Sequence, residues 1–471
     1  CTHASNVTGD GNDIAQIGTL CEKYNLYFIL DASQTAGAAG IDMEQDHISA
    51  ICFTGHKGLF GPQGTGGIAL ADGVCVKPLL SGGSGVHSFE RKHPMELPAA
   101  LEAGTLNGHG IAGLHAALDW IKKTGIAAIH EKEMALAEQF QRGIETIPGI
   151  HLYGGEKRVA AIVSCNLADL DSAYVSDCLA EDYGIATRAG VHCAPLMHTH
   201  FGTEKQGMVR FSFSCFNTTE EVEKAVRAMQ DIAAENRGKV TAYVGAGGKT
   251  SSIRKRAETL RAEGKRVLIL TTTKMMVPQE QEIFAAYEQT GQESVISATA
   301  SVWQERRAAE KQLKERVQSV LDTYGCCVAG SLIPGTEKFG MLPEKLMEDL
   351  LYLADEILIE ADGSAHMPVK APAEHEPVLF PYMDEVVIVM GAHAIGKPLQ
   401  KVCHRVDYAK KILKCDADKI VTAADIRALA EQGYAIPIQK QFPWMKISKV
   451  TGKDIKLCLT AEKKDKVRDK Q

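Results

Sequence analysis

Two lysines, each in a glycine-rich loop, are the residues of this sequence best suited to chemistry. Lys57 follows Thr54-Gly-His, and Lys249 ends Gly245-Ala-Gly-Gly-Lys249. A lysine amine can hold an aldehyde cofactor covalently, whereas a lysine in a glycine-rich turn before a helix can bind a nucleotide phosphate. Because the two chemistries differ, we expect a fusion of two proteins that act on one pathway.

The composition is that of an ordinary globular protein. The chain has 471 residues, a formal net charge of −7 and 45% hydrophobic residues. This length predicts two or three domains, and the negative charge offers no electrostatic basis for binding nucleic acid or an anionic membrane. No apolar run is long enough to span a membrane. The 13 cysteines lack the paired spacing of zinc sites or disulfide frameworks, which favours reduced thiols in the cytoplasm.

Strand-like runs alternate with amphipathic helical patterns, which predicts an α/β fold. Buried strands are expected at 26–30 and 48–53, followed by the polar residues Asp31 and Thr54. Ligand-binding groups of α/β proteins gather at the carboxyl ends of strands. The polar residues around Lys57 therefore have the location of a binding site.

The same patterns divide the chain. We expect a first domain at 1–236, a linker at 237–239, a second domain at 240–430 and a divergent lysine-rich segment at 431–471. Thr218 and Glu221 have capping-box spacing at the start of the helix that closes the first domain. A strand, a glycine-rich turn, a helix at 250–263 and another strand open the second domain in βαβ order. Residues 446–471 are expected to form a solvated tail.

The residues around Lys57 have the types that a pyridoxal phosphate site needs. Such a site requires a carboxylate for the pyridinium nitrogen, donors for the ring oxygen and the phosphate, and a cation for the substrate carboxylate. Asp31 can supply the carboxylate, and Gln34 can reach the ring oxygen. Thr54 and His56 flank Lys57 as phosphate or ring contacts.

Residues 2–235 resemble the class V aminotransferase fold, in its cysteine desulfurase and selenocysteine lyase branch. The resemblance implies pyridoxal-phosphate fold type I, with part of the large domain and the C-terminal small domain present, and a homodimer. Because the family begins before this chain does, we expect the N-terminal part of the fold to be missing. The motifs that carry the resemblance are Thr2-His-Ala-Ser-Asn6-Val-Thr-Gly9, Asp31-Ala-Ser-Gln34, Thr54-Gly-His-Lys57, Glu102-Ala-Gly-Thr105-Leu-Asn107, Arg188-Ala-Gly-Val-His-Cys193-Ala-Pro195 and Val209-Arg210-Phe-Ser212.

This resemblance implies roles for further residues. Asn6 would contact the cofactor ring oxygen, and Thr105 would reach the phosphate in the neighbouring subunit. Arg210, with Arg188, would bind the substrate carboxylate, for which a guanidinium offers two parallel donors. Cys193 would take sulfur or selenium from cysteine or selenocysteine as a persulfide or perselenide, leaving alanine.

Only a thiolate can attack in this way, so Cys193 needs cations nearby. Arg188 and His192 are candidates for that electrostatic support. In one alternative interpretation, the first half is a class V aminotransferase or lyase in which Cys193 is not catalytic. In another, the protein is a non-catalytic scaffold or carrier.

In the second half, a glycine-rich turn joins a strand to a helix, so backbone N–H groups and the helix dipole can converge on an anion. The usual phosphate-loop spacing requires glycine at position 243, where this chain has Tyr243, so the loop is a variant. A generic glycine-rich turn is the alternative. The residues expected to bind nucleotide are Gly245, Gly247, Gly248, Lys249 and Thr250.

An acidic strand end completes the expected nucleotide site. The apolar run 356–360 leads into Asp362, where a magnesium-binding acid of a phosphate-loop enzyme belongs. We therefore expect ATP or GTP with Mg²⁺, and Thr250 and Asp362 as the metal-binding residues.

Residues 240–430 resemble the YqeC family, accessory proteins of selenium-dependent molybdenum hydroxylases. The resemblance implies a molybdenum hydroxylase or its maturation proteins as partners. Together, the halves predict a bifunctional cytoplasmic protein that delivers sulfur or selenium to such a hydroxylase. The motifs are Val244-Gly-Ala-Gly-Gly-Lys-Thr250, Thr271-Thr-Thr-Lys274, Glu360-Ala-Asp-Gly-Ser364, Lys370-Ala-Pro-Ala-Glu-His-Glu-Pro377 and His404-Arg405.

Overall fold

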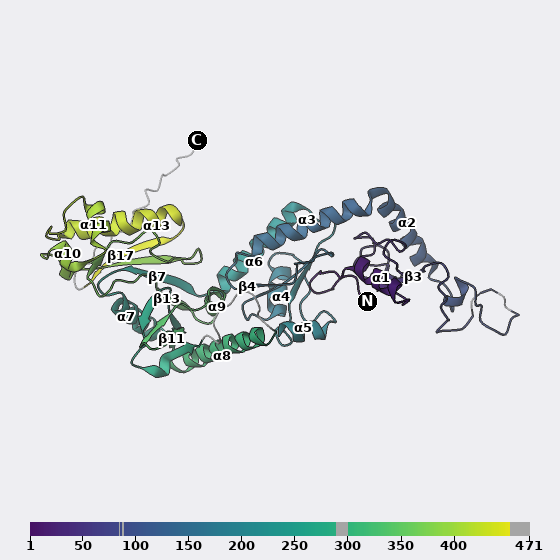
Figure 1. The fold of residues 1–471 in the computed structure, drawn as a ribbon, viewed down its shortest axis with the longest axis horizontal. Coiled ribbons are helices and arrows are strands. Elements are labelled where there is room, and N and C mark those ends of the chain that lie inside the picture. Colours follow the sequence, from purple (N-terminus) through teal and green to yellow (C-terminus); the bar gives the residue numbers. More distant parts are fainter. Residues whose placement is uncertain (84, 87–88, 289–299, 453–471) are drawn as a thin grey trace. The chain divides into compact units, whose positions relative to one another are not determined.

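The structure, a computed structural model, describes residues 1–83, 85–86, 89–288 and 300–452. The chain divides into two compact units, Cys1–Ala233 and Ala234–Gln471. Each unit mixes helices with strands, which can be followed in Figure 1, so the α/β prediction is confirmed at this level. The division falls in the last turn of helix α6 (Thr219–Asn236), shortly before strand β7 (Lys239–Gly245) begins.

A three-stranded sheet in the first unit carries the Lys57 loop. Strands β1 (Ile29–Asp31) and β2 (Ala50–Thr54) are parallel, and β3 (Gly66–Leu70) pairs with β2 in the antiparallel direction. Parallel pairing brings the carboxyl ends of two strands to the same edge of a sheet. Asp31 therefore ends β1 at the edge where β2 leads into the Lys57 loop.

The strand expected at 26–30 is shorter than its apolar run. Strand β1 includes only the end of that run, while Leu26 and Tyr27 are 61% and 74% exposed. Helix α1 (Ile14–Lys23) packs against Leu30 on the buried side of the sheet. The prediction was wrong for the beginning of the run, because an apolar run does not show which side chains other elements will cover.

The second sheet of the first unit positions Arg210 and the Cys193 loop. Strand β5 (Ile162–Leu167) is buried along its length and pairs in the antiparallel direction with β4 (Ile150–Tyr153) and β6 (Val209–Ser212). Arg210 lies on β6 and forms an isolated bridge with Arg188. The other helices of this unit are η1 (Ala99–Leu101), α2 (Gly108–Thr124), α3 (Ile126–Ile144), α4 (Ser172–Glu181) and α5 (Pro195–Phe201).

Helix α6 confirms the predicted capping box at its first turn. The backbone N–H of Thr218 donates to the Glu221 carboxylate at 3.1 Å, and the Glu221 N–H donates to Thr218 Oγ1 at 3.3 Å. These two bonds satisfy backbone donors that the helix itself leaves unpaired.

A nine-stranded sheet forms the core of the second unit. Its order is β17-β15-β7-β13-β8-β11-β12-β9, with β10 also paired to β11. The strands from β17 to β11 are parallel, whereas β12 and β9 are antiparallel to their neighbours. The strands after β7 are β8 (Val267–Thr271), β9 (Lys274–Met276), β10 (Phe284–Tyr287), β11 (Cys326–Leu332), β12 (Lys338–Gly340), β13 (Glu356–Glu360), β15 (Glu385–Gly391) and β17 (Lys446–Gly452); β14 (Val369–Lys370) pairs separately with β16 (Cys403–His404).

Strand β7 lies at the point where the order of the sheet reverses. Strand β8, which follows β7 in the chain, lies on one side of β7 with β13 between them. The later strands β15 and β17 lie on the other side of β7. In open α/β sheets, ligands bind at the carboxyl ends of strands at such a switch point. Gly245 ends β7 and Glu360 ends the adjacent β13, so both lie at this edge.

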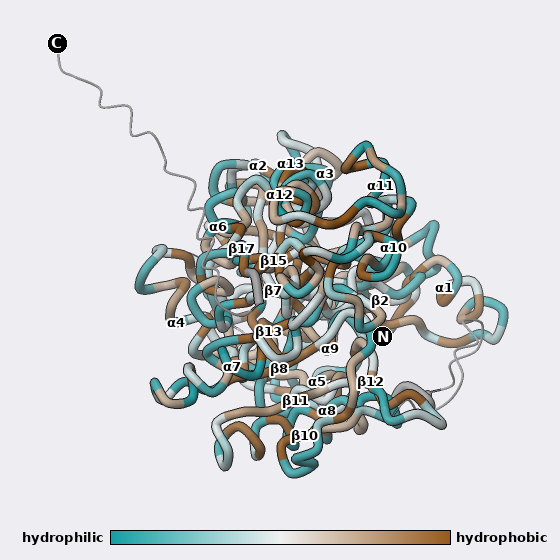
Figure 2. Tube along the Cα trace, turned by 90° about the vertical axis from the view of Figure 1, so that its left-hand side faces the viewer, coloured by the Kyte–Doolittle hydropathy of each residue, from teal (hydrophilic) through white to brown (hydrophobic). Residues whose placement is uncertain are grey.

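Buried side chains cover both faces of this sheet. Figure 2 labels most of its strands along a trace coloured by hydropathy. Helix α7 (Lys249–Ala262) packs Ile253 and Leu260 against Leu358 on one face. The larger cluster, on the other face, includes Val244 and Tyr434. The remaining helices are η2 (Gln281–Ile283), α8 (Ala300–Tyr324), α9 (Glu344–Leu350), η3 (Ala392–Ala394), α10 (Leu399–Val402), α11 (Val406–Leu413), α12 (Ala423–Ala428), the π-helix η4 (Leu429–Ala435) and α13 (Ile436–Gln441).

The expected solvated tail at 446–471 begins with a strand instead. Its first residues form β17, which pairs in parallel with β15 over the whole of its length. Ile447 packs against the core, and Lys449 forms an ion pair with Glu431. The prediction was wrong here because lysines are common on an edge strand, where they deter further pairing. The rest of the expected tail lies outside the described residues.

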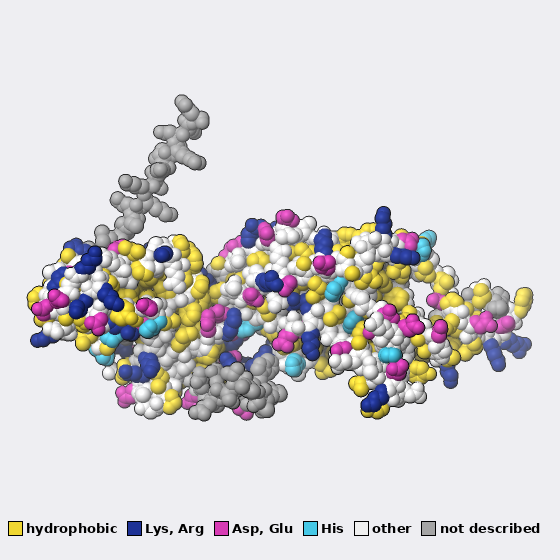
Figure 3. Space-filling view, turned by 45° about the horizontal axis from the view of Figure 1, so that its top comes forward, with side chains coloured by type: hydrophobic (Ala, Val, Ile, Leu, Met, Phe, Trp, Pro, Cys, Tyr) yellow, Lys and Arg dark blue, Asp and Glu magenta, His cyan; other side chains and the backbone are white. Residues whose placement is uncertain are grey.

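Across the residues that the structure describes, no helix has both the length and the apolar content needed to cross a membrane. In Figure 3, Lys and Arg side chains are interspersed with Asp and Glu side chains over the visible face. That face therefore carries no broad surface of a single charge sign.

Candidate functional sites

Three charged groups, those of Asp31, Arg188 and Arg210, act electrostatically on Lys57 in the first unit. Burial lowers the pKa of the Lys57 amine, the negative charge of Asp31 opposes this shift, and the positive charges of Arg210 and Arg188 add to it. An amine with a lowered pKa is more often unprotonated, and only the unprotonated amine can bond to an aldehyde carbon. Lys57 thus lies within electrostatic reach of three other residues expected at the site.

The loops beside Lys57 present further polar side chains. Asp31 Oδ1 accepts hydrogen bonds from the backbone N–H of Ser33 at 3.0 Å and from its hydroxyl at 2.5 Å. Gln34, in the same turn, is half-buried, as is Thr54 at the end of β2. His56 and Thr105 are exposed, and Thr105 lies in the segment that leads to α2.

Cys193 is exposed on a loop in which neighbouring residues have an unusual backbone conformation. His192 has a φ of 53° and Cys193 a φ of 57°, in the left-handed region that costs non-glycine residues about 1–3 kcal/mol. Arg188 Nη2 donates to Cys193 Sγ at 3.7 Å. The loop therefore presents the thiol to solvent with a guanidinium beside it.

A chain of hydrogen bonds holds this loop from behind. His192 Nε2 bonds to the Arg188 carbonyl oxygen at 2.9 Å, so that nitrogen carries the proton and Nδ1 must accept. His192 Nδ1 is 3.4 Å from His198 Nε2, which then donates, and His198 Nδ1 accepts from the Thr203 hydroxyl at 2.8 Å. Burial lowers the pKa of both His192 and His198, which agrees with two neutral rings.

This chain changes the role expected for His192. A neutral imidazole adds no positive charge near the thiol, so the cationic support for Cys193 comes from Arg188. The sequence did not mark His198 or Thr203 as supporting residues, because their part depends on contacts between turns of the folded loop.

Arg210 is only partly paired. Its Nη1 donates to the Asn6 carbonyl oxygen at 2.9 Å, while its buried Nε has no hydrogen-bond partner among the described residues. Burial lowers the pKa of Arg210, and repulsion from Arg188 adds to this effect. Because the Arg188 charge lies close to Arg210, an incoming carboxylate would stabilise the two guanidiniums. Asn6 links this site to the Cys193 loop, because its side-chain amide donates to the His192 carbonyl oxygen at 2.7 Å.

In the second unit, the glycines of the phosphate-loop motif are required by the backbone. Gly245, Gly247 and Gly248 have φ values of 92°, 77° and 127°. A Cβ atom at Gly245 would lie 2.2 Å from the Val389 oxygen, and one at Gly247 would lie 2.4 Å from the Pro368 oxygen. A Cβ at Gly248 would meet nothing within 4 Å. The loop is therefore packed against its neighbours on one side and open where helix α7 begins, which is the location of an anion site.

Lys249 and Thr250 occupy the first turn of α7. Lys249 Nζ donates to the Gly245 carbonyl oxygen at 2.8 Å, and Thr250 Oγ1 donates to Glu360 Oε2 at 2.8 Å. Burial lowers the pKa of Lys249, while the charges of Glu360 and Asp362 oppose that shift. Burial also raises the pKa of Glu360, and Lys249 opposes this. Thr250 and Asp362 were the residues expected to bind the metal ion, but the hydroxyl of Thr250 is paired with Glu360.

Asp362 is fully buried and surrounded by donors. Its Oδ2 accepts from the Gly245 N–H at 3.1 Å and from the Tyr434 hydroxyl at 2.7 Å, and its Oδ1 is paired with Lys370. Lys370 also pairs with Glu376 at 2.8 Å and is fully buried. Both Asp362 oxygens are therefore engaged within the protein. Tyr434 lies on the π-helix η4, and no motif in the sequence marks it as a site residue.

Two residues of the Lys370–Pro377 motif differ from Lys370 in exposure. Glu374 and His375 are exposed in the loop after β14, while Glu376 pairs with both Lys370 and Arg405. Although burial opposes the shift, the hydrogen bonds from Lys370 and Arg405 lower the pKa of Glu376 to about 2.

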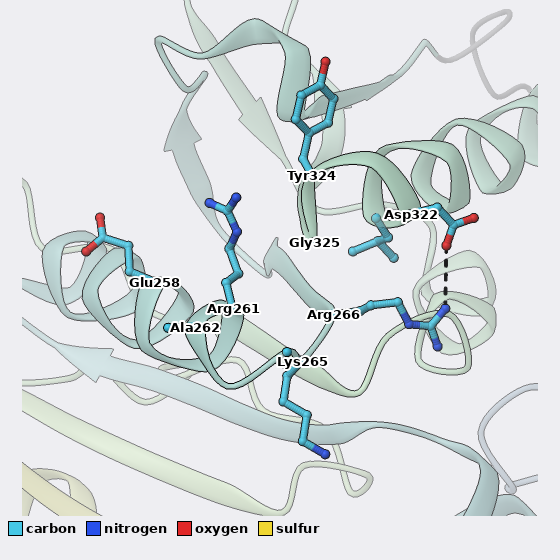
Figure 4. A pocket seen from close by; sticks show the side chains of 10 residues that line it. Glu258, Arg261, Ala262, Lys265, Arg266, Asp322, Tyr324 and Gly325 are labelled. Atoms are coloured by element: carbon cyan, nitrogen blue, oxygen red, sulfur yellow. Dashed lines mark ion pairs between the residues drawn. The ribbon is translucent and has the colours of Figure 1, made fainter.

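A pocket of about 630 Å³ lies elsewhere in the second unit. Arg261, Lys265 and Arg266 line it together with Tyr324, and Figure 4 shows the ion pair between Arg266 and Asp322 at 4.0 Å. These residues precede β8 and β11, at the amino ends of the strands. Ligand sites of parallel sheets lie at the opposite edge, so the phosphate-loop edge is the better candidate.

The two halves of the chain match two different families. The class-V aminotransferase family matches residues 1–225, and the YqeC protein family matches residues 241–407. The chain joins a class-V aminotransferase region to a YqeC region. Both resemblances expected from the sequence motifs are therefore confirmed.

The class-V region is similar to cysteine desulfurases. It is 34% identical over 237 residues to a probable cysteine desulfurase of Methanothermobacter thermautotrophicus, which covers 49% of this chain and 59% of the relative. A cysteine desulfurase of Shigella flexneri is 32% identical over 236 residues, covering 49% and 57%. The apo structure of a cysteine desulfurase from Thermococcus onnurineus NA1 has a TM-score of 0.46 and 30% identity, over 50% of this chain and 59% of that one. The chain spans less than two thirds of the length of these proteins.

Proposed function

We propose that the class-V region is a pyridoxal-phosphate-dependent cysteine desulfurase or selenocysteine lyase with part of a type I fold. The observation that carries this proposal is the exposed Cys193 thiol beside Arg188. The partly paired Arg210 nearby and the names of the relatives add support. A guanidinium suits this role because it binds a thiolate more strongly than a thiol.

The residues present fit the cofactor. Lys57, whose pKa is lowered mainly by burial, would hold the cofactor aldehyde, and Asp31 would pair with the ring nitrogen. The further cofactor contacts would come from Asn6, Gln34, Thr54, His56 and Thr105. When bound, pyridoxal phosphate would supply an electron sink conjugated to the substrate Cα.

The protein's own residues would then bind the substrate and accept its sulfur. Arg210, with Arg188, would bind the substrate carboxylate. The Cys193 thiolate would bond to the substrate sulfur or selenium as the bond to Cβ breaks. The electron pair of that bond stays with the carbon, which takes up a proton to give alanine, and Cys193 carries the persulfide or perselenide.

Two measurements test this half of the proposal. Alanine and sulfide, or selenide, should be released from cysteine or selenocysteine in the presence of a reductant, and Cys193→Ala should abolish the release. If Cys193→Ala keeps full activity, the protein is instead a class-V lyase or aminotransferase with a non-catalytic thiol. Lys57→Ala should also remove the visible absorbance of bound pyridoxal phosphate, and absorbance that survives this change would contradict the role of Lys57.

We propose that the YqeC region binds ATP or GTP with Mg²⁺. The open space at Gly248, before the first turn of α7, supports a phosphate site there. Lys249 would move from its own loop carbonyl to the phosphates, and Thr250 with Glu360 would face the metal ion. Lys249→Ala should weaken nucleotide binding at least tenfold, as titration with a fluorescent ATP analogue would measure. Unchanged affinity would exclude this site.

We propose that the two regions serve one pathway, the delivery of sulfur or selenium to a molybdenum hydroxylase or its maturation proteins. The support is the fusion of a class-V aminotransferase region to a YqeC region, together with the hydroxylase accessory role that the YqeC resemblance implies. A homodimer through the class-V region is part of this proposal. Selenium-75 transfer from the labelled protein to a molybdenum hydroxylase should occur with wild-type protein and fail with Cys193→Ala. A protein that holds the hydroxylase without cofactor or nucleotide would be a scaffold instead.

A further inference from the structure

The carboxylate of Asp362 joins three separate segments of the second unit. It accepts hydrogen bonds from the Gly245 N–H and the Tyr434 hydroxyl, at 3.1 and 2.7 Å, and forms an ion pair with Lys370. Asp362, Lys370 and Tyr434 are each fully buried. Such a buried group is costly to rearrange, because each donor would lose its partner away from water.

The first of these segments is the phosphate loop. Gly245 gives its N–H to Asp362, and its carbonyl oxygen accepts from Lys249 Nζ at 2.8 Å. Both polar groups of the first loop residue are thus held, in a left-handed conformation that only glycine adopts easily. The bond from the Gly245 N–H to Asp362 therefore holds the loop at the point where it leaves β7.

The charge around Asp362 is already balanced. Asp362 pairs with Lys370, Lys370 pairs with Glu376, and Glu376 pairs with Arg405, which gives two acids and two cations. Glu360 has a different environment, because the hydrogen bond that its carboxylate accepts comes from the neutral Thr250 hydroxyl. When Asp362 and Glu360 are compared, Glu360 is therefore the carboxylate that an added divalent cation would stabilise.

We propose that Asp362 is a positioning residue that braces the phosphate loop and is itself held by Tyr434 and Lys370, while Glu360 serves the metal ion. The proposal rests on nucleotide binding by the YqeC region. It gives a function to η4 (Leu429–Ala435), which lies beyond the residues matched by the YqeC family. π-helical turns are rare and frequently occur at functional sites.

Tyr434→Phe tests the brace because it removes one hydroxyl and keeps the ring. The matched control is Tyr382→Phe, since Tyr382 lies in the same core and its buried hydroxyl has no hydrogen-bond partner among the described residues. In the full chain without ligand, Tyr434→Phe should increase hydrogen exchange of the amides at 245–249, and Tyr382→Phe should not. Unchanged exchange in Tyr434→Phe would overturn the brace.

Nucleotide titrations separate positioning from metal binding. With ATP and GTP as probes, Tyr434→Phe should weaken binding about tenfold both in Mg²⁺ and in EDTA, because the loop is less often in its binding conformation. Glu360→Gln should lose the gain in affinity that Mg²⁺ provides and keep the binding seen in EDTA. If Asp362→Asn or Tyr434→Phe lost only the Mg²⁺-dependent gain, Asp362 would be a metal ligand and the proposal would fail.

The exchange measurement also distinguishes this inference from the proposed function. If the wild-type protein bound neither ATP nor GTP, nucleotide binding would be excluded. Faster exchange at 245–249 in Tyr434→Phe would then still establish the brace as a structural element, and its role in a nucleotide site would be overturned.

Discussion

Arg210 Nη1 donates a hydrogen bond of 2.9 Å to the backbone carbonyl oxygen of Asn6, which lies 204 residues earlier in the chain. The side-chain amide of the same asparagine donates to the His192 carbonyl oxygen at 2.7 Å. Asn6 thereby connects the arginine proposed to bind the substrate carboxylate with the loop that presents Cys193. A change at Asn6 should therefore alter the position of the Cys193 thiol relative to the bound substrate.

Asn6→Ala removes the amide that tethers the Cys193 loop and that is proposed to contact the cofactor, and it keeps the backbone bond to Arg210. We expect kcat for sulfide release from cysteine to fall about 2- to 10-fold, as for the loss of one hydrogen bond, with a smaller change in KM. Asn12→Ala is the matched control, because its amide also donates to a backbone carbonyl, that of Thr2, at 2.8 Å. Equal losses in the two variants would contradict a specific role for Asn6.

Because His192 and His198 are buried, we expect the free energy of unfolding to fall in mild acid. Burial lowers the pKa of His192 and His198 below the ordinary value of 6.5, so the unfolded chain binds more protons than the folded one below that pH. Stability from these groups is present above about pH 6.5 and is lost as the pH falls towards their folded pKa values. Thermal unfolding of the first unit should show this decline.

His198→Gln should make that decline shallower, because the variant has one fewer group to protonate on unfolding. His115→Gln is the control, since the side chain of His115 is 77% exposed and paired with Asp119 at the surface. A pH dependence in His198→Gln as steep as in the wild-type protein would exclude the pair as its source.

Arg188 should control the reactivity of Cys193. Because its guanidinium donates to the sulfur at 3.7 Å, Arg188→Gln should slow alkylation of Cys193 at neutral pH about 3- to 10-fold. Mass spectrometry of the Cys193 peptide after timed exposure to iodoacetamide measures this rate. Arg142→Gln, at an exposed arginine paired with Glu138, should leave the rate unchanged. An unaltered rate in Arg188→Gln would mean that the thiol does not depend on this cation.

A comparison of two glycines in the second unit distinguishes the free-energy cost of steric crowding from that of backbone strain. Gly247 and Gly264 have φ values of 77° and 80°, but a Cβ would lie 2.4 Å from the Pro368 oxygen at Gly247 and would meet nothing within 4 Å at Gly264. Gly264→Ala should cost about 1–2 kcal/mol of the free energy of unfolding, from strain alone. Gly247→Ala should cost about 2 kcal/mol more, because the loop must shift. Urea denaturation compares them, and equal costs would contradict the crowding.

Much of the local structure followed from the sequence. The capping box at Thr218 and the strand at 356–360 were confirmed, because each depends on residues adjacent in the chain. Helix α7 begins at Lys249, one residue before the expected start, since its N-terminus is set by the glycines ahead of it. The motif order also identified both families, which the comparisons confirmed.

Other features could not be predicted because they join distant residues. Tyr434 donates to Asp362 across 72 positions of sequence, and no local pattern marks either side chain as a partner of the other. The lysine-rich composition of 446–471 concealed a strand at its beginning, β17, that pairs with β15. The exposure of Leu26 likewise depends on which elements cover the first sheet.

The sequence by itself determined the residue types for two chemistries and the order of the elements that carry them, because motifs and hydrophobic periodicity are local. Tertiary structure alone decided the partners of the two acids at the end of β13: Glu360 meets Thr250, and Asp362 meets Gly245 and Tyr434. The physical reason is burial. A carboxylate removed from water takes its role from the donors that the fold brings to it, and those donors come from segments that only folding places together.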